Sequence, residues 1–180
     1  MKYGGDIVKF VGDAMIVLWP PLADPPPALA DRARRAGQCA LEIQSEFHNK
    51  QTMQGFSRLS VKIGLGAGPC SLLHVGGIFG RTEYLIVGAA LHEALAAEAG
   101  VQKGGEIVAA PTAWKLLAAH FDATPTKADP ALHKLTRLTG PVAASRNDTY
   151  LYLQSLDEDE TRLLGQKAAA YVPAAIRPYL

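Results

Sequence analysis

Near its start the chain reads Gly4-Gly5-Asp6-Ile7-Val8-Lys9-Phe10-Val11-Gly12-Asp13-Ala14. Two short apolar runs, Ile7 to Val11 and Ala14 to Trp19, flank the pair Gly12-Asp13. Because Gly and Asp tolerate the backbone dihedrals of a tight turn, this pattern predicts a β-hairpin with the pair at its tip. A carboxylate at such a tip projects into solvent, where it is placed to bind a divalent cation that also takes phosphate oxygens. From the local pattern alone, a turn without a ligand is the commoner explanation.

The rest of the chain interleaves predicted helices and strands. Apolar residues at spacings of three and four predict a long amphipathic helix over Leu29 to Phe47 and an Ala-rich helix over Ala89 to Ala99 that ends at Gly100. A third helix is predicted from Pro111 to His120. We expect a loop over Ala123 to Asp129 and strands over Ser60 to Leu65, Ser71 to Val75, Tyr84 to Val87, Glu106 to Ala109, Lys134 to Leu138 and Thr149 to Leu153. This order predicts an α+β fold with a mixed sheet rather than a doubly wound parallel one.

The composition excludes several classes of protein. Of 180 residues, 48% are hydrophobic and 19% are charged, which is typical of a globular domain with a continuous core. Eighteen basic against seventeen acidic residues give a net charge of +1, so no basic surface is expected to recruit nucleic acid or an anionic membrane. Two cysteines without metal-ligand spacing argue against a disulfide scaffold or a zinc site. No apolar run approaches the roughly 20 residues of a transmembrane segment, and a cytoplasmic location is expected.

Three segments carry a family resemblance: Gly4 to Trp19, Val61-Lys62-Ile63-Gly64-Leu65 and Tyr84-Leu85-Ile86-Val87-Gly88. In this order and spacing they resemble the class III nucleotidyl cyclase family of adenylyl and guanylyl cyclases, and within it the first catalytic half of soluble, bicarbonate-responsive adenylyl cyclases. The resemblance runs from about Gly4 to Trp114. It implies a ferredoxin-like or palm-type, mainly antiparallel mixed sheet with helices packed on it. It also implies conversion of ATP to 3',5'-cyclic AMP and pyrophosphate at a dimer interface, in intracellular signal transduction.

The resemblance also implies a domain division. We expect a catalytic domain over residues 1–155 and a C-terminal helix or linker over 156–180, which opens with the acidic run Asp157 to Glu160. In the family, two aspartates hold two Mg²⁺ or Mn²⁺ ions, and the second aspartate falls on Asp13, beside Gly12. The first belongs to an earlier strand that this sequence does not contain. A truncated chain lacking that strand is the favoured explanation, and a product that has lost one ligand is the alternative.

Two lysines match basic positions of the family. Lys62 stands where a basic residue contacts the triphosphate, although a lone strand lysine is commonly just solvated. Lys9 stands where a lysine binds purine, or bicarbonate in the regulated subtype. Its plain alternative is a side chain that covers the apolar hairpin.

The chain departs from the family in the helix after Gly88. Leu91, His92 and Ala96 replace the Val, Asn and Arg that orient the ribose and stabilise phosphate charge. A symmetric homodimer is therefore expected to be weak or inactive, and a complementary cyclase half with Asn and Arg is the implied partner. Leu95 replaces an Arg of the anion site, which puts bicarbonate activation in doubt. His92 is an alternative pH-dependent cation there, although such a histidine is more often without a role.

Parts of the sequence suggest two other functions. The substitutions in this helix favour a non-catalytic regulatory pseudo-cyclase that pairs with an active cyclase domain. A diguanylate cyclase is suggested by Gly4-Gly5-Asp6. It is discounted because Asp6 leads into a strand and the turn carboxylate is Asp13, seven positions later.

Overall fold

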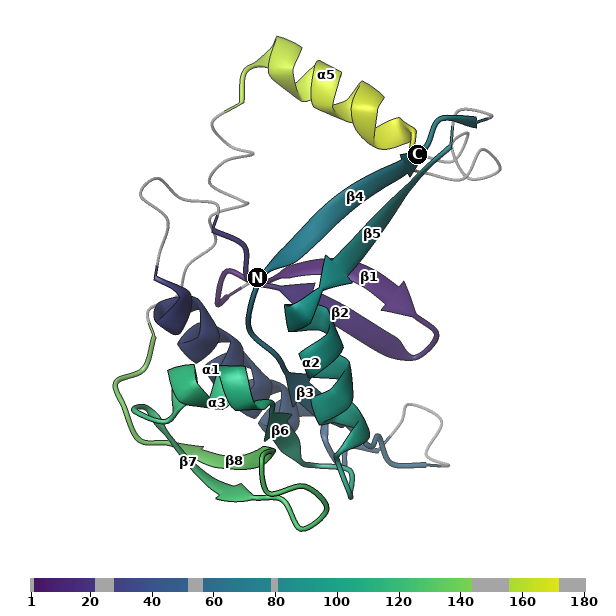
Figure 1. Cartoon of the computed structure of the whole chain (residues 1–180). Helices are drawn as coiled ribbons and strands as arrows, with labels where there is room; N and C mark the ends of the chain where they lie inside the picture. The colour runs from purple at the N-terminus through teal and green to yellow at the C-terminus, as the bar shows by residue number, and fades with distance from the viewer. Residues whose placement is uncertain (1, 22–27, 52–56, 79–80, 144–155, 172–180) are drawn as a thin grey trace.

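A four-stranded sheet carries the main buried core. The structure is a computed structural model that describes residues 2–21, 28–51, 57–78, 81–143 and 156–171. The sheet has the order β3-β6-β8-β7, with a parallel β3–β6 pair and antiparallel pairs elsewhere. Its strands are β3 (Ile63–Leu65), β6 (Ile107–Ala109), β7 (Phe121–Pro125) and β8 (His133–Leu138). Figure 1 shows α1 (Leu29–Phe47) and α3 (Pro111–Leu117) packed beside this sheet.

The core is built from small and aliphatic side chains of these elements. Ile107, Val108 and Leu117 are its largest fully buried residues. A main cluster joins α1, α3 and the sheet through Ala40, Leu65, Ala67, Ile107, Ala109, Ala113, Leu117, Phe121 and Leu135. Burying each such aliphatic side chain stabilises the fold by roughly 1.5–3 kcal/mol, so this part of the chain holds the domain together.

Helix α2 (Ala89–Ala99) lies directly against β3 because two glycines remove the side chains between them. A Cβ atom on Gly64 would lie 2.1 Å from the Ala94 carbonyl oxygen, and one on Gly66 would lie 2.2 Å from the Ala90 carbonyl oxygen. The helix thereby buries Ala97 in a second cluster with Val101, Val108, Ala110 and Leu132.

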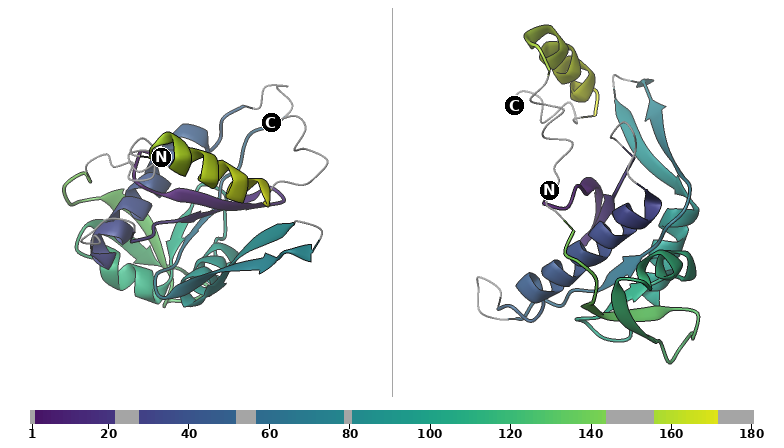
Figure 2. Two further views of the ribbon diagram at one scale, coloured as in Figure 1. Left: turned by 90° about the horizontal axis from the view of Figure 1, so that it is seen from above. Right: turned by 90° about the vertical axis from the view of Figure 1, so that its left-hand side faces the viewer.

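Two hairpins form separate two-stranded sheets. One consists of β1 (Asp6–Val11) and β2 (Ala14–Leu18), and the other of β4 (Cys70–Gly76) and β5 (Thr82–Gly88). Figure 2 shows the β4–β5 ribbon extending away from the helices and the four-stranded sheet. A last helix, α5 (Glu158–Ala169), begins with a capping box between Asp157 and Glu160 and has no buried residue. None of the described helices is long and apolar enough to span a membrane.

The predicted α+β fold with a mainly antiparallel mixed sheet is confirmed, and the bounds of α1 and α2 agree with the prediction. Gly100 follows α2 for a different reason than the one expected. Its φ is −74°, so it is not a left-handed cap; a Cβ there would lie 2.6 Å from Leu132 Cδ1. Some elements are shorter than predicted: β3 begins at Ile63, and α3 ends at Leu117.

One expected loop is a strand. Residues 121–125 form β7, whereas Ala123 to Asp129 was predicted to be a loop. Pairing with β8 decides this conformation, since the local sequence has low strand propensity. Pro125 fits because β7 is at the edge of the sheet, where a missing backbone donor is tolerated. The strand predicted over Thr149 to Leu153 lies outside the described residues.

Candidate active site

The hairpin predicted to carry the metal ligand is fixed at its base. The carbonyl of Tyr3 accepts a 3.0 Å hydrogen bond from Trp19 Nε1, and Arg32 of α1 donates one of 2.9 Å to the Trp19 carbonyl. The hydroxyl of Tyr3, which is buried, donates to Glu42 of the same helix. These contacts attach the base of the hairpin to α1 and leave its tip to project.

The tip consists of Gly12 and Asp13, as predicted. Val11 pairs with Ala14 across the turn, and Gly12 has a φ of 62°, a value that favours glycine. Asp13 does not share this backbone conformation, so only the glycine of the pair is required by the turn. The Asp13 side chain is exposed, and within the described part of the chain it has no hydrogen-bond or ion-pair partner. Its carboxylate is therefore free to bind a ligand.

Lys9 lies on β1 of the same hairpin, opposite Ile16, and is half-buried. A register shift between Ile7 and Lys9 marks a β-bulge, which locally reorients the strand. Lys62 lies on a different element: it is exposed and stands just before β3, not within a strand as predicted. Among the described residues, no hydrogen bond or ion pair joins either lysine to Asp13.

The backbone around Lys62 is held in place from two sides. The carbonyl of Val61 accepts hydrogen bonds from Gln44 Nε2 of α1, at 3.1 Å, and from the Gly105 amide, at 2.7 Å. The amide of Ile63 donates to the Glu106 carbonyl at 3.2 Å. Lys62 thus extends from a fixed segment, although the sheet that contains β3 shares no strand pairing with the hairpin.

The described residues of this chain offer one carboxylate ligand for a metal ion at the hairpin tip. Mg²⁺ is commonly held by one or two carboxylates and by substrate phosphates. Asp6 cannot act on the same ion as Asp13, because Asp6 pairs with Leu18 at the base of the hairpin and Asp13 lies at its tip, roughly 20 Å away along the strand. The described residues contain no group of three or more His, Cys, Asp or Glu side chains placed to hold a metal ion. Asp13 fits as a single carboxylate ligand.

The exposed side of α2 lacks the Asn and Arg that the resemblance to cyclases places in this helix. His92, Leu95 and Ala96 are all exposed there, and Leu95 is 56% exposed. Leu91 is partly buried on the same helix. No arginine lies in this helix, so stabilisation of phosphate charge by α2 is absent from this chain.

Large aliphatic and aromatic side chains are exposed on both hairpins. They are Ile7, Phe10, Val11 and Met15 on the first and Leu72, Leu73, Val75, Leu85 and Val87 on the second. Exposed apolar side chains gathered on one element are typical of an interaction site. Phe10, Val11 and Met15 flank the Asp13 turn, so a partner that covers them would also approach the carboxylate.

The structure also shows a cluster that the sequence did not predict. His74 and Tyr84 are directly opposite in the β4–β5 ribbon, and Tyr171 contacts His74. Burial and the nearby Asp6 carboxylate raise the pKa of Tyr84 above its usual 10.0. The observed register of the ribbon places the first two residues opposite each other, and no local signal in the sequence connects them with Tyr171.

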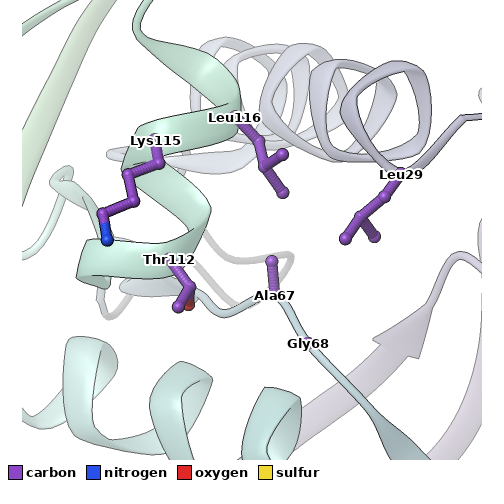
Figure 3. A pocket seen from close by; sticks show the side chains of 6 residues that line it. All are labelled: Leu29, Ala67, Gly68, Thr112, Lys115 and Leu116. Atoms are coloured by element: carbon purple, nitrogen blue, oxygen red, sulfur yellow. The ribbon is translucent and has the colours of Figure 1, made fainter.

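A small pocket lies elsewhere, between the start of α1, the β3–β4 connection and α3 (Figure 3). It has a volume of about 240 Å³ and an apolar lining of Leu29, Ala67, Gly68, Thr112, Lys115 and Leu116. None of the predicted site residues lines it. The pocket therefore contributes nothing to a site at the hairpin tip.

Comparison with known proteins shows what the chain is similar to. No protein-family model matches the chain. Over 117 residues the chain is 32% identical to adenylate cyclase type 10 of Oryctolagus cuniculus and 33% identical to that of Rattus norvegicus. Each match spans 63% of this chain and 7% of the relative.

Solved structures show the same fold. The guanylyl cyclase Cya2 matches with a TM-score of 0.62 and 25% identity, over 79% of this chain and 75% of that one. The adenylyl cyclase CyaB from P. aeruginosa matches with a TM-score of 0.58 and 20% identity, over 79% and 76%. The chain is homologous to class III nucleotidyl cyclase catalytic domains.

The resemblance seen in the three sequence segments is thus confirmed for the cyclase family. A dimeric guanylyl cyclase domain, that of the RhoGC fusion protein from Blastocladiella emersonii, matches with a TM-score of 0.61 and 20% identity, over 76% of this chain and 74% of that one. Adenylyl and guanylyl cyclases share this fold, so the fold does not distinguish ATP from GTP as a substrate.

Proposed function

We propose that this chain is the metal-donating half of an adenylyl cyclase that converts ATP to 3',5'-cyclic AMP and pyrophosphate in the cytoplasm. The main support for this proposal is the Asp13 carboxylate, which is exposed and has no partner among the described residues. It lies at the tip of a hairpin whose base is fixed to α1. The sequence similarity to adenylate cyclase type 10 supports ATP as the substrate. The rest of the site is supplied by a complementary cyclase half.

In this proposal the ribose 3'-hydroxyl gives up its proton to solvent water as its oxygen attacks the α-phosphorus, and the bond from that phosphorus to the bridging oxygen breaks, which releases pyrophosphate. Asp13 binds one Mg²⁺ or Mn²⁺ ion, which when bound neutralises triphosphate charge and orients the reacting groups. Lys62 contacts the triphosphate. Lys9, which lies on the same hairpin, contacts the purine or a small anion such as bicarbonate.

The partner supplies what this chain lacks. An Asn and an Arg from the complementary half replace the functions absent at His92 and Ala96 of α2. The exposed apolar side chains of the two hairpins form the surface that this half covers, which brings its transition-state residues toward the Asp13 turn. This chain alone is expected to be weak or inactive.

The test is cyclic AMP formation from Mn²⁺-ATP by the full chain mixed with a cyclase half that contains Asn and Arg. We expect Asp13→Asn to reduce turnover by about 10²–10³-fold, the usual effect of removing a charge-stabilising group. Asp6→Asn is the matched control, because Asp6 is a carboxylate of the same hairpin but lies at the start of β1, away from the turn that contains Asp13. Equal loss in both variants, or none in either, would contradict the proposed role of Asp13.

A second candidate is a regulatory pseudo-cyclase that pairs with an active cyclase domain without contributing to turnover. The exposed face of α2 favours it, since Leu95 and Ala96 replace charged groups there. The same mixture separates the two candidates. A heterodimer seen by sedimentation that forms no cyclic AMP above the level of the partner alone supports the regulatory module.

A further inference from the structure

The residue before Lys62 is held by side chains from the end of α1. The Val61 amide donates a 3.3 Å hydrogen bond to Nδ1 of His48, which is the C-cap residue of α1. The Val61 carbonyl accepts from Gln44 Nε2 at 3.1 Å, and the same nitrogen donates to the Glu106 carbonyl at 3.2 Å. Both backbone polar groups of Val61 are therefore satisfied by side chains that α1 positions.

The His48 ring is half-buried and packs against two glycines. A Cβ atom on Gly105 would lie 2.7 Å from His48 Nε2, and one on Gly104 would lie 3.3 Å from His48 Cε1. Gly105 has a φ of 93°, which favours glycine, and its amide donates to the Val61 carbonyl at 2.7 Å. The absence of side chains at these two positions leaves room for the ring next to Val61.

The hydrogen bond to Val61 depends on the protonation state of His48. A backbone amide can only donate, so Nδ1 must accept, and it does so only in a neutral ring with its proton on Nε2. A protonated ring carries a hydrogen on both nitrogens and would place a donor against the Val61 amide. Histidine is the side chain that ordinarily changes charge between about pH 5 and 8.

Charged side chains occur on each segment that surrounds the ring. They are Glu46 and Lys50 at the end of α1, Arg58 and Lys62 before β3, and Lys103 and Glu106 before β6. Each of the two acids is paired with a lysine. Among the described residues the His48 ring forms no ion pair, and its one hydrogen bond is the one from Val61. Protonation of the ring therefore acts first on the Val61 amide.

We propose that His48 is a positioning residue for Lys62: its neutral ring fixes the backbone from which Lys62 reaches the triphosphate. This inference rests on the proposed function, in which Lys62 contacts the triphosphate. Lys62 is exposed and has no partner within the described chain, so the adjacent backbone determines where its side chain begins. Protonation of His48 removes one hydrogen bond from this backbone and weakens ATP binding. The groups that take part in bond breaking are unchanged.

The test compares wild type, His48→Asn and His48→Leu in the full chain mixed with the complementary cyclase half. An Asn side chain offers an acceptor that does not titrate, whereas Leu offers none. The KM for Mn²⁺-ATP and kcat are measured at roughly pH 5 and 8, together with hydrogen exchange at the Val61 amide. Each KM is divided by that of His48→Asn at the same pH, which cancels the titration of the triphosphate itself.

We expect the KM ratio of wild type to rise about two- to tenfold from the higher to the lower pH, which is the range of one hydrogen bond. The ratio for His48→Leu should be raised at both pH values, with faster exchange at Val61. The kcat ratios should not change, because a contact with the triphosphate that is equal in the ground and transition states affects KM alone.

A Lys62→Gln background shows whether His48 acts through Lys62. In that background His48→Leu should have no further effect on KM. His120→Asn is the control: His120 is half-buried, its ring has no hydrogen-bond partner in the described ranges, and it precedes β7, at the opposite edge of the sheet from β3. This variant should keep the pH profile of wild type and its exchange at Val61.

Faster exchange at Val61 in His48→Leu with an unchanged KM would overturn the inference and leave the proposed function intact. A wild-type KM ratio that is the same at both pH values would also overturn it, as would an equal effect of His48→Leu with and without Lys62. If His48→Leu does not fold, the comparison of wild type with His48→Asn still decides. If the wild-type mixture forms no cyclic AMP, the proposed function has failed, and the positioning role of His48 fails with it.

Discussion

Apolar side chains are buried in the helices and the four-stranded sheet but exposed on the two hairpins. The first part, α1, α2, α3 and the sheet β3-β6-β8-β7, is called the body below. Val108 and Leu117 in the body are 0% and 1% exposed, whereas Val75 and Phe10 on the hairpins are 49% and 68% exposed. Asp13 and Lys9, which have proposed chemical roles, lie on the first hairpin. Lys62 lies just before β3 of the body. The body therefore stabilises the domain, and the hairpins present exposed apolar side chains that the proposed partner would cover.

The largest effect should come from truncating the core. Leu117→Ala is expected to lower the free energy of unfolding by about 2–5 kcal/mol, because its side chain is fully buried in the main cluster. Leu73→Ala on the β4–β5 ribbon should change it by less than about 0.5 kcal/mol. Urea denaturation of the isolated chain measures both. Similar losses in the two variants would show that the ribbon is as well packed as the body.

The next largest effect on stability should come from disturbing the close contact between α2 and β3. Gly64→Ala is expected to cost about 1–3 kcal/mol, because its Cβ would meet backbone atoms of α2 that cannot move independently. Gly165→Ala is the control, since nothing lies within 4 Å of that position on α5. A small effect of Gly64→Ala in urea denaturation would indicate that α2 shifts easily against β3.

The sequence predicts the elements whose local pattern agrees with their packing. The apolar stripe of α1 and the Gly12-Asp13 turn are examples, because one amphipathic period and one glycine suffice for each. Residues 121–125 show where this approach fails: they form β7 only because β8 pairs with them. Such pairing depends on tertiary structure and leaves no local signal.

The local sequence likewise predicts only part of the candidate site. The turn at Gly12-Asp13 predicts that Asp13 and Lys9 share one hairpin, and the structure places both on it. Lys62 and Asp13 belong to separate sheets, so their relation depends on how those sheets are arranged. The contact of Tyr171 with His74 spans 97 residues and joins two exposed side chains, so neither hydrophobic periodicity nor turn chemistry indicates it.

A third, smaller effect tests the hairpin tip. Gly12→Ala is expected to destabilise the chain by about 1 kcal/mol, since a φ of 62° is unfavourable for a residue with a Cβ, even though no atom lies within 4 Å. Gly12→Asn should recover much of this loss, because asparagine tolerates the left-handed region. Thermal unfolding of the three proteins compares them. Equal stability of wild type and Gly12→Ala would mean that the turn relaxes without cost, which the exposed hairpin tip permits and the body does not.

The smallest effect concerns acid and the start of α1. Burial raises the pKa of Asp31, but hydrogen bonds from Arg35 at 2.8 Å and Arg34 at 2.9 Å outweigh it and hold the pKa below its usual 3.8. Because the folded-state pKa is the lower one, the stabilisation is complete above the unfolded value and is lost as pH falls through the folded one. Asp31→Asn should therefore cost about 0.5–1 kcal/mol at pH 7, as expected for two partly exposed helix pairs, and almost nothing near pH 2. Urea denaturation at both pH values measures the difference, with Asp159→Asn, which is far more exposed, as the control. A cost that does not depend on pH would assign the role of Asp31 to packing rather than to its charge.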